Sequence, residues 1–127
     1  MTRLFIKICT GRFVTERAEQ CLEMVNPRDL HIENYLTIDV EDYYQVSAFE
    51  NIIGYGKWDN HCSRVVANTR KVLDILERKG VHATFFVLGW VAEKFPGLIK
   101  DIQLKGHEIG CHSYCHRLIY DLSPEEF

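Results

Sequence analysis

The chain has 127 residues, of which 46% are hydrophobic and 26% charged, so it is long enough and apolar enough to form one domain with a core. Its formal net charge of −3 lacks the basic excess that is typical of nucleic-acid-binding proteins. Its longest apolar run, residues 83–92, is much shorter than the roughly 20 residues of a membrane-spanning helix. We therefore expect neither nucleic acid nor the bilayer interior as a partner.

Residues 1–33 are predicted to be a poorly defined extension, with a strand at 4–8 and a short helix at 15–25. The N-terminus begins like a signal peptide, but Lys7 interrupts its apolar stretch and no small-residue cleavage site follows. The five cysteines are irregularly spaced and do not resemble a disulfide framework. Both features favour a cytoplasmic location.

The pattern becomes sharper at residues 35–38, an apolar run that predicts a buried strand. Three acids follow within four positions, namely Asp39, Glu41 and Asp42. Crowded carboxylates repel one another, and a bound cation would offset that cost. The alternative is a solvated acidic turn without a ligand.

An aromatic, glycine-containing segment at residues 49–58 is predicted to be a loop. Flat amphipathic rings suit a sugar-binding groove, although ordinary packing beneath a loop explains them equally well. The rings in question are those of Tyr43, Tyr44, Phe49, Tyr55 and Trp58.

The rest of the chain alternates strands and helices. An amphipathic helix is predicted from Ser63 to Lys79, with Gly80 ending it, and a strand buried on both faces at residues 83–88. One or two helices at 90–105 lead to a buried strand at 107–111, and Ser123 marks a further helix start. This order predicts an α/β fold with parallel strands, whose carboxyl ends share one rim.

Two histidines, His112 and His116, follow the last strand. On a helical turn, side chains four positions apart lie on one face, so both imidazoles can reach one cation such as zinc. The hydroxyl of Ser113 can hold the turn by bonding nearby backbone. Cys111 and Cys115 interleave with these histidines and offer a Cys/His zinc site as an alternative, but we prefer them as small packing residues.

The acids and the histidines are predicted to meet, because both follow strands at the same rim. One carboxylate with two imidazoles is a metal-ligand set that leaves coordination positions open for water, which indicates a catalytic site.

Four segments together resemble the NodB-homology polysaccharide deacetylases: residues 37–42, 83–89, 106–110 and 112–116. The Asp-Val-Glu-Asp sequence of the first segment is similar to a subgroup associated with bacterial exopolysaccharides. The resemblance covers a domain at residues 34–127 and implies a distorted (β/α) barrel, a divalent metal, usually zinc, and hydrolysis of N-acetyl groups from the amino sugars of a polysaccharide.

The resemblance also implies roles for individual residues. Asp39 matches the catalytic base that deprotonates a water held by the metal, and His112 and His116 match two metal ligands. The carboxylate ligand corresponds to Glu41 in a D-x-D register, with Asp42 as the rival. The other histidines lie outside these motifs and receive no role.

The later motifs of that family, including the histidine that serves as general acid, have no counterpart in this sequence. Only about three of the seven or eight barrel strands are expected. The chain is therefore expected to be the N-terminal half of such a domain, incompletely closed and inactive alone. The alternatives are a non-catalytic fragment that binds metal or glycan, and a deacetylase of peptidoglycan or a small amide.

Overall fold

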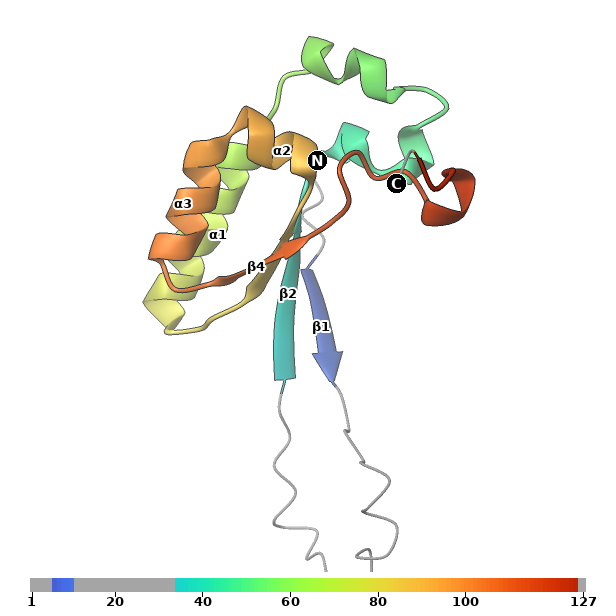
Figure 1. The fold of residues 1–127 in the computed structure, drawn as a ribbon. Helices are drawn as coiled ribbons and strands as arrows, with labels where there is room; N and C mark the ends of the chain where they lie inside the picture. The colour runs from blue at the N-terminus through green and yellow to red at the C-terminus, as the bar shows by residue number, and fades with distance from the viewer. Residues whose placement is uncertain (1–5, 11–33, 126–127) are drawn as a thin grey trace, which may run out of the picture.

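The computed structural model describes residues 6–10 and 34–125 as one open sheet with helices on one side (Figure 1). The strands are β1 (Ile6–Thr10), β2 (Asn34–Val40), β3 (Thr84–Val87) and β4 (Glu108–Cys111). The helices are α1 (Val65–Lys79), α2 (Gly89–Lys94) and α3 (Pro96–Leu104). Short 3-10 turns are η2 (Tyr43–Gln45), η3 (Ser47–Phe49), η4 (Tyr55–Asn60) and η5 (Ile119–Asp121).

The sheet has the order β1-β2-β3-β4, in which β2, β3 and β4 are parallel and β1 is antiparallel to β2. The α/β fold with parallel strands is therefore confirmed. Strand β1 overlaps the strand predicted at 4–8, whereas the helix predicted at 15–25 lies outside the described residues. Within the described part of the chain the sheet stays open, with β1 and β4 at its edges.

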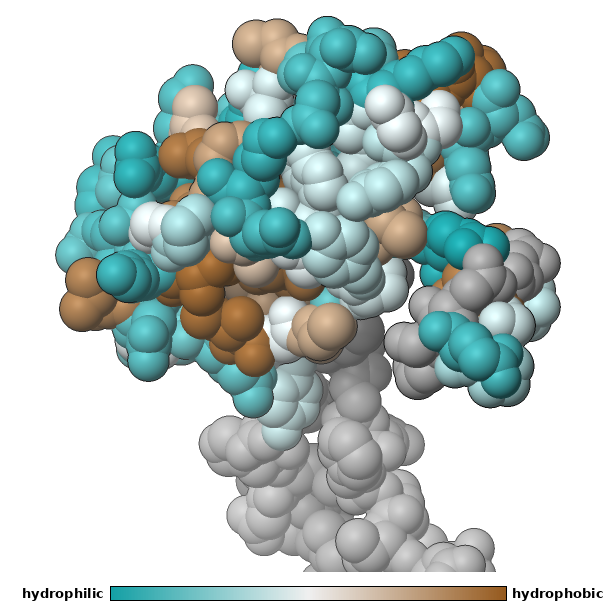
Figure 2. Space-filling model, turned by 45° about the horizontal axis from the view of Figure 1, so that its top comes forward, coloured by the Kyte–Doolittle hydropathy of each residue, from teal (hydrophilic) through white to brown (hydrophobic). Residues whose placement is uncertain are grey.

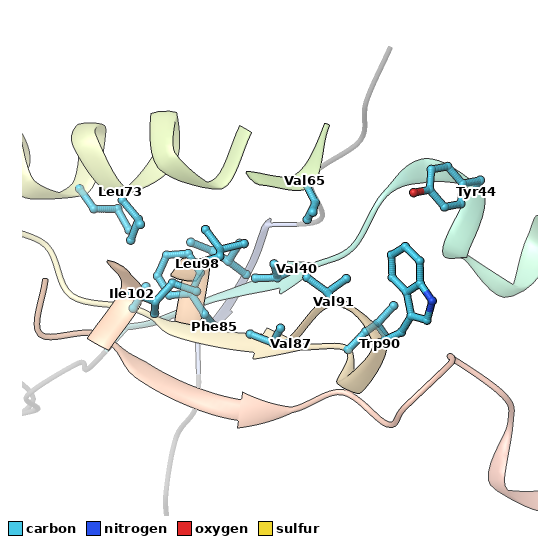
Figure 3. Packing of buried hydrophobic residues seen from close by; sticks show 14 of the residues in the cluster. Val40, Tyr44, Val65, Leu73, Phe85, Val87, Trp90, Val91, Leu98 and Ile102 are labelled. Carbon is cyan, nitrogen blue, oxygen red and sulfur yellow. The ribbon is translucent and has the colours of Figure 1, made fainter. Parts of the chain in front are cut away.

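The core lies between the sheet and the helices (Figure 3). Alternate residues of β2 and β3, such as Val40 and Phe85, point into it, and α1 contributes Val65 and Leu73 from one stripe of its surface. Helix α1 ends as predicted, at Gly80 in the left-handed conformation, with a φ of 62° that favours glycine.

The other face of the parallel strands carries no helix among the described residues. Burial along β3 alternates, so that Phe85 and Val87 are buried whereas Thr84 and Phe86 are only half-buried. The prediction that this strand is buried on both faces is wrong for the described residues, because the helices lie on one side only. The prediction of a buried strand at 107–111 is also wrong, since β4 is an edge strand whose Ile109 is exposed.

Two helix predictions at 90–105 are confirmed as α2 and α3, with Pro96 at the start of α3. The segment predicted as a loop at 49–58 contains parts of η3 and η4. Ser123 is followed by a turn at residues 124–125, where the described chain ends. None of the helices in the described ranges is both long and apolar enough to cross a bilayer.

Candidate metal centre

Three potential ligands converge at the carboxyl ends of β2 and β4. Oε2 of Glu41 lies 3.4 Å from Nε2 of His116 and 3.8 Å from Nε2 of His112. The two imidazole rings meet edge to face, with their centroids 4.8 Å apart. One ligand atom from each of the three residues lies within 4.8 Å of the others.

The sheet itself brings these residues together. Glu41 comes directly after β2, and His112 comes directly after β4, two strands away across β3. The His112 backbone N–H donates to the Val87 carbonyl at 3.0 Å, so the end of β4 is tied to the end of β3. The predicted meeting of acid and histidines at one rim follows from this parallel register.

The histidine segment is not a helical turn, so the predicted conformation is wrong. Residues 112–118 form a loop in which Ser113 and His116 have φ values of 58° and 61°. The hydroxyl of Ser113 accepts the His116 N–H at 3.0 Å, which confirms its role in holding the turn. Two left-handed residues, rather than a helical repeat, make the rings converge.

Helix α2 holds this loop in place. The N–H groups of Gly89 and Trp90 donate to the carbonyls of Ser113 and Tyr114, at 2.9 and 3.0 Å. These donors belong to the first turn of α2, where no partner exists within the helix. The same bonds therefore satisfy the helix end and fix the loop between the two imidazoles.

The neighbouring acid, Asp42, has a different role. Its carboxylate accepts hydrogen bonds from the Ser63 hydroxyl at 2.7 Å, from the Arg64 N–H at 3.1 Å and from the Val65 N–H at 3.3 Å. It thus caps the start of α1 from another part of the chain, which is why the helix begins at Val65 rather than at Ser63. The structure places Glu41, and not Asp42, beside the imidazoles.

Gln45 is a residue that the sequence analysis did not single out. Its Oε1 accepts the Asp42 N–H at 2.7 Å and so fixes the backbone next to Glu41. An acid followed three positions later by glutamine is the spacing of a capping box, which is the signal that could have identified it.

Asp39 lies within β2, in register with Phe86 and Gly110 of the neighbouring strands. Its neighbours Ile38 and Val40 point into the core, so its half-buried side chain belongs to the opposite face of the sheet. A Cβ on Gly110 would lie 2.6 Å from the Phe86 ring, which shows that this ring occupies the space above Gly110 on that face.

The donor set fits a divalent cation. Ligands about 2.0–2.2 Å from a tetrahedral zinc lie roughly 3.3–3.6 Å apart. The Glu41–His116 distance of 3.4 Å falls within this span, and the Glu41–His112 distance of 3.8 Å is slightly longer. Neither cysteine belongs to the set of converging ligands. Cys115 packs against the core, as predicted for a small packing residue, whereas Cys111 is exposed and does not.

An aromatic cluster borders the centre. The Trp58 ring lies at its centre and meets the rings of Tyr44, Tyr55 and Trp90 edge to face. Burial and the negative charge of Asp42 raise the pKa of Tyr44 to about 12, so its hydroxyl keeps its proton at neutral pH. Tyr44 and Trp58 are buried, whereas Tyr55 remains nearly half exposed.

Comparison with known proteins points to one family. The family model described as polysaccharide deacetylase matches residues 54–127, which include both histidines but not the acids after β2. A peptidoglycan-N-acetylglucosamine deacetylase of Bacillus cereus is 46% identical over 59 residues, 46% of this chain and 22% of the relative. A chitooligosaccharide deacetylase of Azorhizobium caulinodans is 38% identical over 58 residues, 46% of this chain and 28% of the relative.

Among solved structures, that of the peptidoglycan deacetylase PdaC from Bacillus subtilis is similar at 40% identity and a TM-score of 0.46, covering 47% of this chain and 30% of PdaC. The chain therefore spans less than a third of the length of these relatives.

Proposed function

The chain belongs to the polysaccharide deacetylase family, and from this premise we propose that it forms the metal-binding part of a hydrolase that removes N-acetyl groups from amino sugars. The observation that carries the proposal is the convergence of Glu41, His112 and His116 at the carboxyl ends of parallel strands. A carboxylate with two imidazoles leaves coordination positions open, as a catalytic site requires.

We propose Zn²⁺ as the ion, because imidazole nitrogen and carboxylate oxygen are ligands that suit it. When bound, zinc supplies a Lewis acid that polarises the acyl carbonyl and lowers the pKa of water. Glu41 and the two histidines would hold the ion, and the α2 and η2 contacts would keep them in place.

Asp39 is our candidate for the general base. It lies two residues before Glu41 on the face of the sheet that the helices leave open. A carboxylate there can take a proton from water that attacks the acyl carbon, which is the role that general base catalysis requires.

The proposed substrate is an N-acetylated glycan. The names of the relatives refer to peptidoglycan and to chitooligosaccharide, and these two glycans share the N-acetylglucosamine unit. The exopolysaccharide expected from the Asp-Val-Glu-Asp motif stays a prediction, as does the cytoplasmic location.

The second candidate function is metal or glycan binding without turnover. One observation favours it: Glu41, His112 and His116 form a complete group of converging ligand atoms, which is sufficient to hold an ion without a general base or acid.

The test combines zinc binding with acetate release from chitotetraose and from peptidoglycan fragments. The proposal expects one zinc per chain, and metal-dependent acetate release by the hydrolase of which this chain forms the metal-binding part. The Asp39→Asn variant is expected to lose acetate release while it retains zinc. The matched control is Asp59→Asn, an exposed aspartate in η4. Zinc binding without acetate release would support the binding function instead, and absence of both zinc binding and glycan binding would refute both.

A further inference from the structure

A small cavity of about 20 Å³ lies against His116 and has no role in the site described so far. Its walls include Gln45 from η2, Trp58 from η4, and Cys115 and His116 from the histidine loop. Because His116 also approaches Glu41, the cavity and the metal centre share one side chain. Whatever enters the cavity therefore lies beside His116, one of the three proposed metal ligands.

Three side chains in this wall carry a buried polar atom without a hydrogen-bond partner among the described residues: the hydroxyl of Tyr44 and two N–H donors. Nε2 of Gln45 and Nε1 of Trp58 are fully buried and make no hydrogen bond within the described part of the chain. The Oε1 of Gln45 is already used by the Asp42 N–H, so its amide orientation is set and its nitrogen is the free end. Leaving a buried donor unpaired costs about 1–3 kcal/mol, and such groups call for an acceptor.

The mouth of the cavity is polar and partly aromatic. Ser47, Glu50 and Arg117 line it and are exposed, and the Tyr55 ring is 46% exposed. Figure 2 brings the top of the Figure 1 view forward and shows mainly hydrophilic and intermediate residues there, with separate hydrophobic patches. A half-exposed ring beside polar groups suits one face of a sugar.

We propose that this cavity, the Gln45–Trp58 pocket, is a subsite for the sugar unit next to the one whose N-acetyl group is cleaved. It accepts one oxygen-bearing substituent, a hydroxyl or an acetamido carbonyl, because two of its free groups donate only and the third, the Tyr44 hydroxyl, can donate as well as accept. Its volume matches such a substituent and not a pyranose ring. This inference rests on the proposed function, which brings an N-acetylated glycan to the centre.

The direct test uses the unaltered protein labelled with ¹⁵N-tryptophan. The chain has two tryptophans, so two indole N–H signals report separately on Trp58 and on Trp90, which does not line the pocket. On titration with chitotetraose, the Trp58 signal is expected to shift downfield as it gains an acceptor, while the Trp90 signal stays nearly unchanged. N-acetylglucosamine alone is too short to span both positions and is expected to leave Trp58 unshifted at the same concentration.

Variants test the same donors by affinity. Trp58→Phe removes one donor and Gln45→Glu replaces the other with an acceptor, while the Oε1 that holds the Asp42 N–H is kept. Each is expected to weaken chitotetraose binding about 2- to 10-fold, which corresponds to one hydrogen bond. Trp90→Phe removes an indole from the same aromatic cluster outside the pocket and is expected to keep the affinity.

The outcomes separate this inference from the proposed function. If acetate is released but the Trp58 signal does not move and both variants bind like Trp90→Phe, the pocket holds only water and the inference is wrong. If the Trp58 signal shifts but the hydrolase that contains this chain releases no acetate, the subsite stands and the deacetylase proposal fails. In an active protein, the variants should raise KM more than they lower kcat, because the contact is made to bound substrate as well as to the transition state.

Discussion

Two adjacent acids have opposite surroundings at the end of β2. Glu41 is 3% exposed and faces imidazole nitrogens, whereas Asp42 is 1% exposed and faces backbone and hydroxyl donors. A carboxylate saturated by hydrogen-bond donors has few lone pairs left for a cation. The two acids therefore have different roles: Glu41 is suited to bind an ion, and Asp42 caps the start of α1.

The amide variants of these two acids should differ. Glu41→Gln is expected to lower zinc affinity by more than the roughly 10–100-fold that loss of an outer-shell partner costs. Asp42→Asn should keep measurable zinc binding but lose about 1–3 kcal/mol of unfolding free energy, because the cap of α1 is weakened. Isothermal titration with zinc and urea unfolding measure the two effects. Loss of zinc binding in Asp42→Asn with unchanged stability would reverse the assignment.

A second residue-scale prediction concerns His107 at the opposite end of β4. Its ring is buried, and its Nδ1 accepts the Ala83 N–H at 3.3 Å. Burial, followed by the nearby His82 and Lys105, lowers its pKa below the usual 6.5. As the pH falls through about 6.5, the unfolded chain takes up this proton before the folded protein does, so the free energy of unfolding falls.

The variant His107→Asn places an amide oxygen where Nδ1 accepts and removes the titration. Urea unfolding between about pH 7.5 and 5.5 should therefore give a shallower loss of stability for the variant than for the unaltered protein. The difference between the two curves cancels the contributions of the other histidines. Parallel curves would show that His107 does not couple folding to pH.

The element that decides the geometry of the centre is the loop of residues 112–118. The position of this loop depends on α2, because the first N–H groups of the helix donate to the carbonyls of Ser113 and Tyr114 in the loop. The close approach requires Gly89, where a Cβ would lie 2.6 Å from Cδ2 and 3.1 Å from Cα of Tyr114. The Tyr114 hydroxyl in turn donates to Glu93 at 2.5 Å and closes the contact from the other side.

Gly89→Ala should therefore displace the loop. We expect a loss of about 1–3 kcal/mol in stability from overpacking, together with weaker zinc binding as the two imidazoles separate. Gly97→Ala in α3 is the matched control, since a Cβ there meets nothing within 4 Å and alanine favours a helix. Thermal unfolding and zinc titration are carried out on both variants. If Gly89→Ala and Gly97→Ala have the same stability and the same zinc affinity, helix α2 does not hold the loop in place.

At the scale of elements, the sequence predicts the strands and α1, because the hydrophobic periodicity determines them. It also predicts that Glu41 meets the histidines, because the order of strands and helices places them at one rim. The conformation of the histidine loop could not be predicted. Two histidines four positions apart can converge on a helical turn, but they can also converge in a loop with two left-handed residues. The role of Asp42 depends on contacts with residues more than 20 positions away, such as Ser63, which no local pattern reveals.

For the whole molecule, the open sheet explains why two burial predictions failed. An apolar strand such as β3 predicts cover on both faces, but helices cover one face of the described residues. The opposite face carries Asp39 and Phe86 in one row, so it holds the proposed base as well as apolar surface. Zinc binding at one end of this sheet should stabilise the whole fold, since an ion that binds only the folded state adds to its stability.

X-ray absorption of the zinc-loaded protein tests the central claim most directly, because it identifies the atoms around the ion. Coordination by Glu41, His112 and His116 predicts one zinc per chain with nitrogen and oxygen at about 2.0–2.2 Å, an imidazole scattering pattern of two rings, and no sulfur. A shell at about 2.3 Å would show thiolate ligands from Cys111 or Cys115 and would contradict this centre, as would a zinc site that persists unchanged in Glu41→Gln.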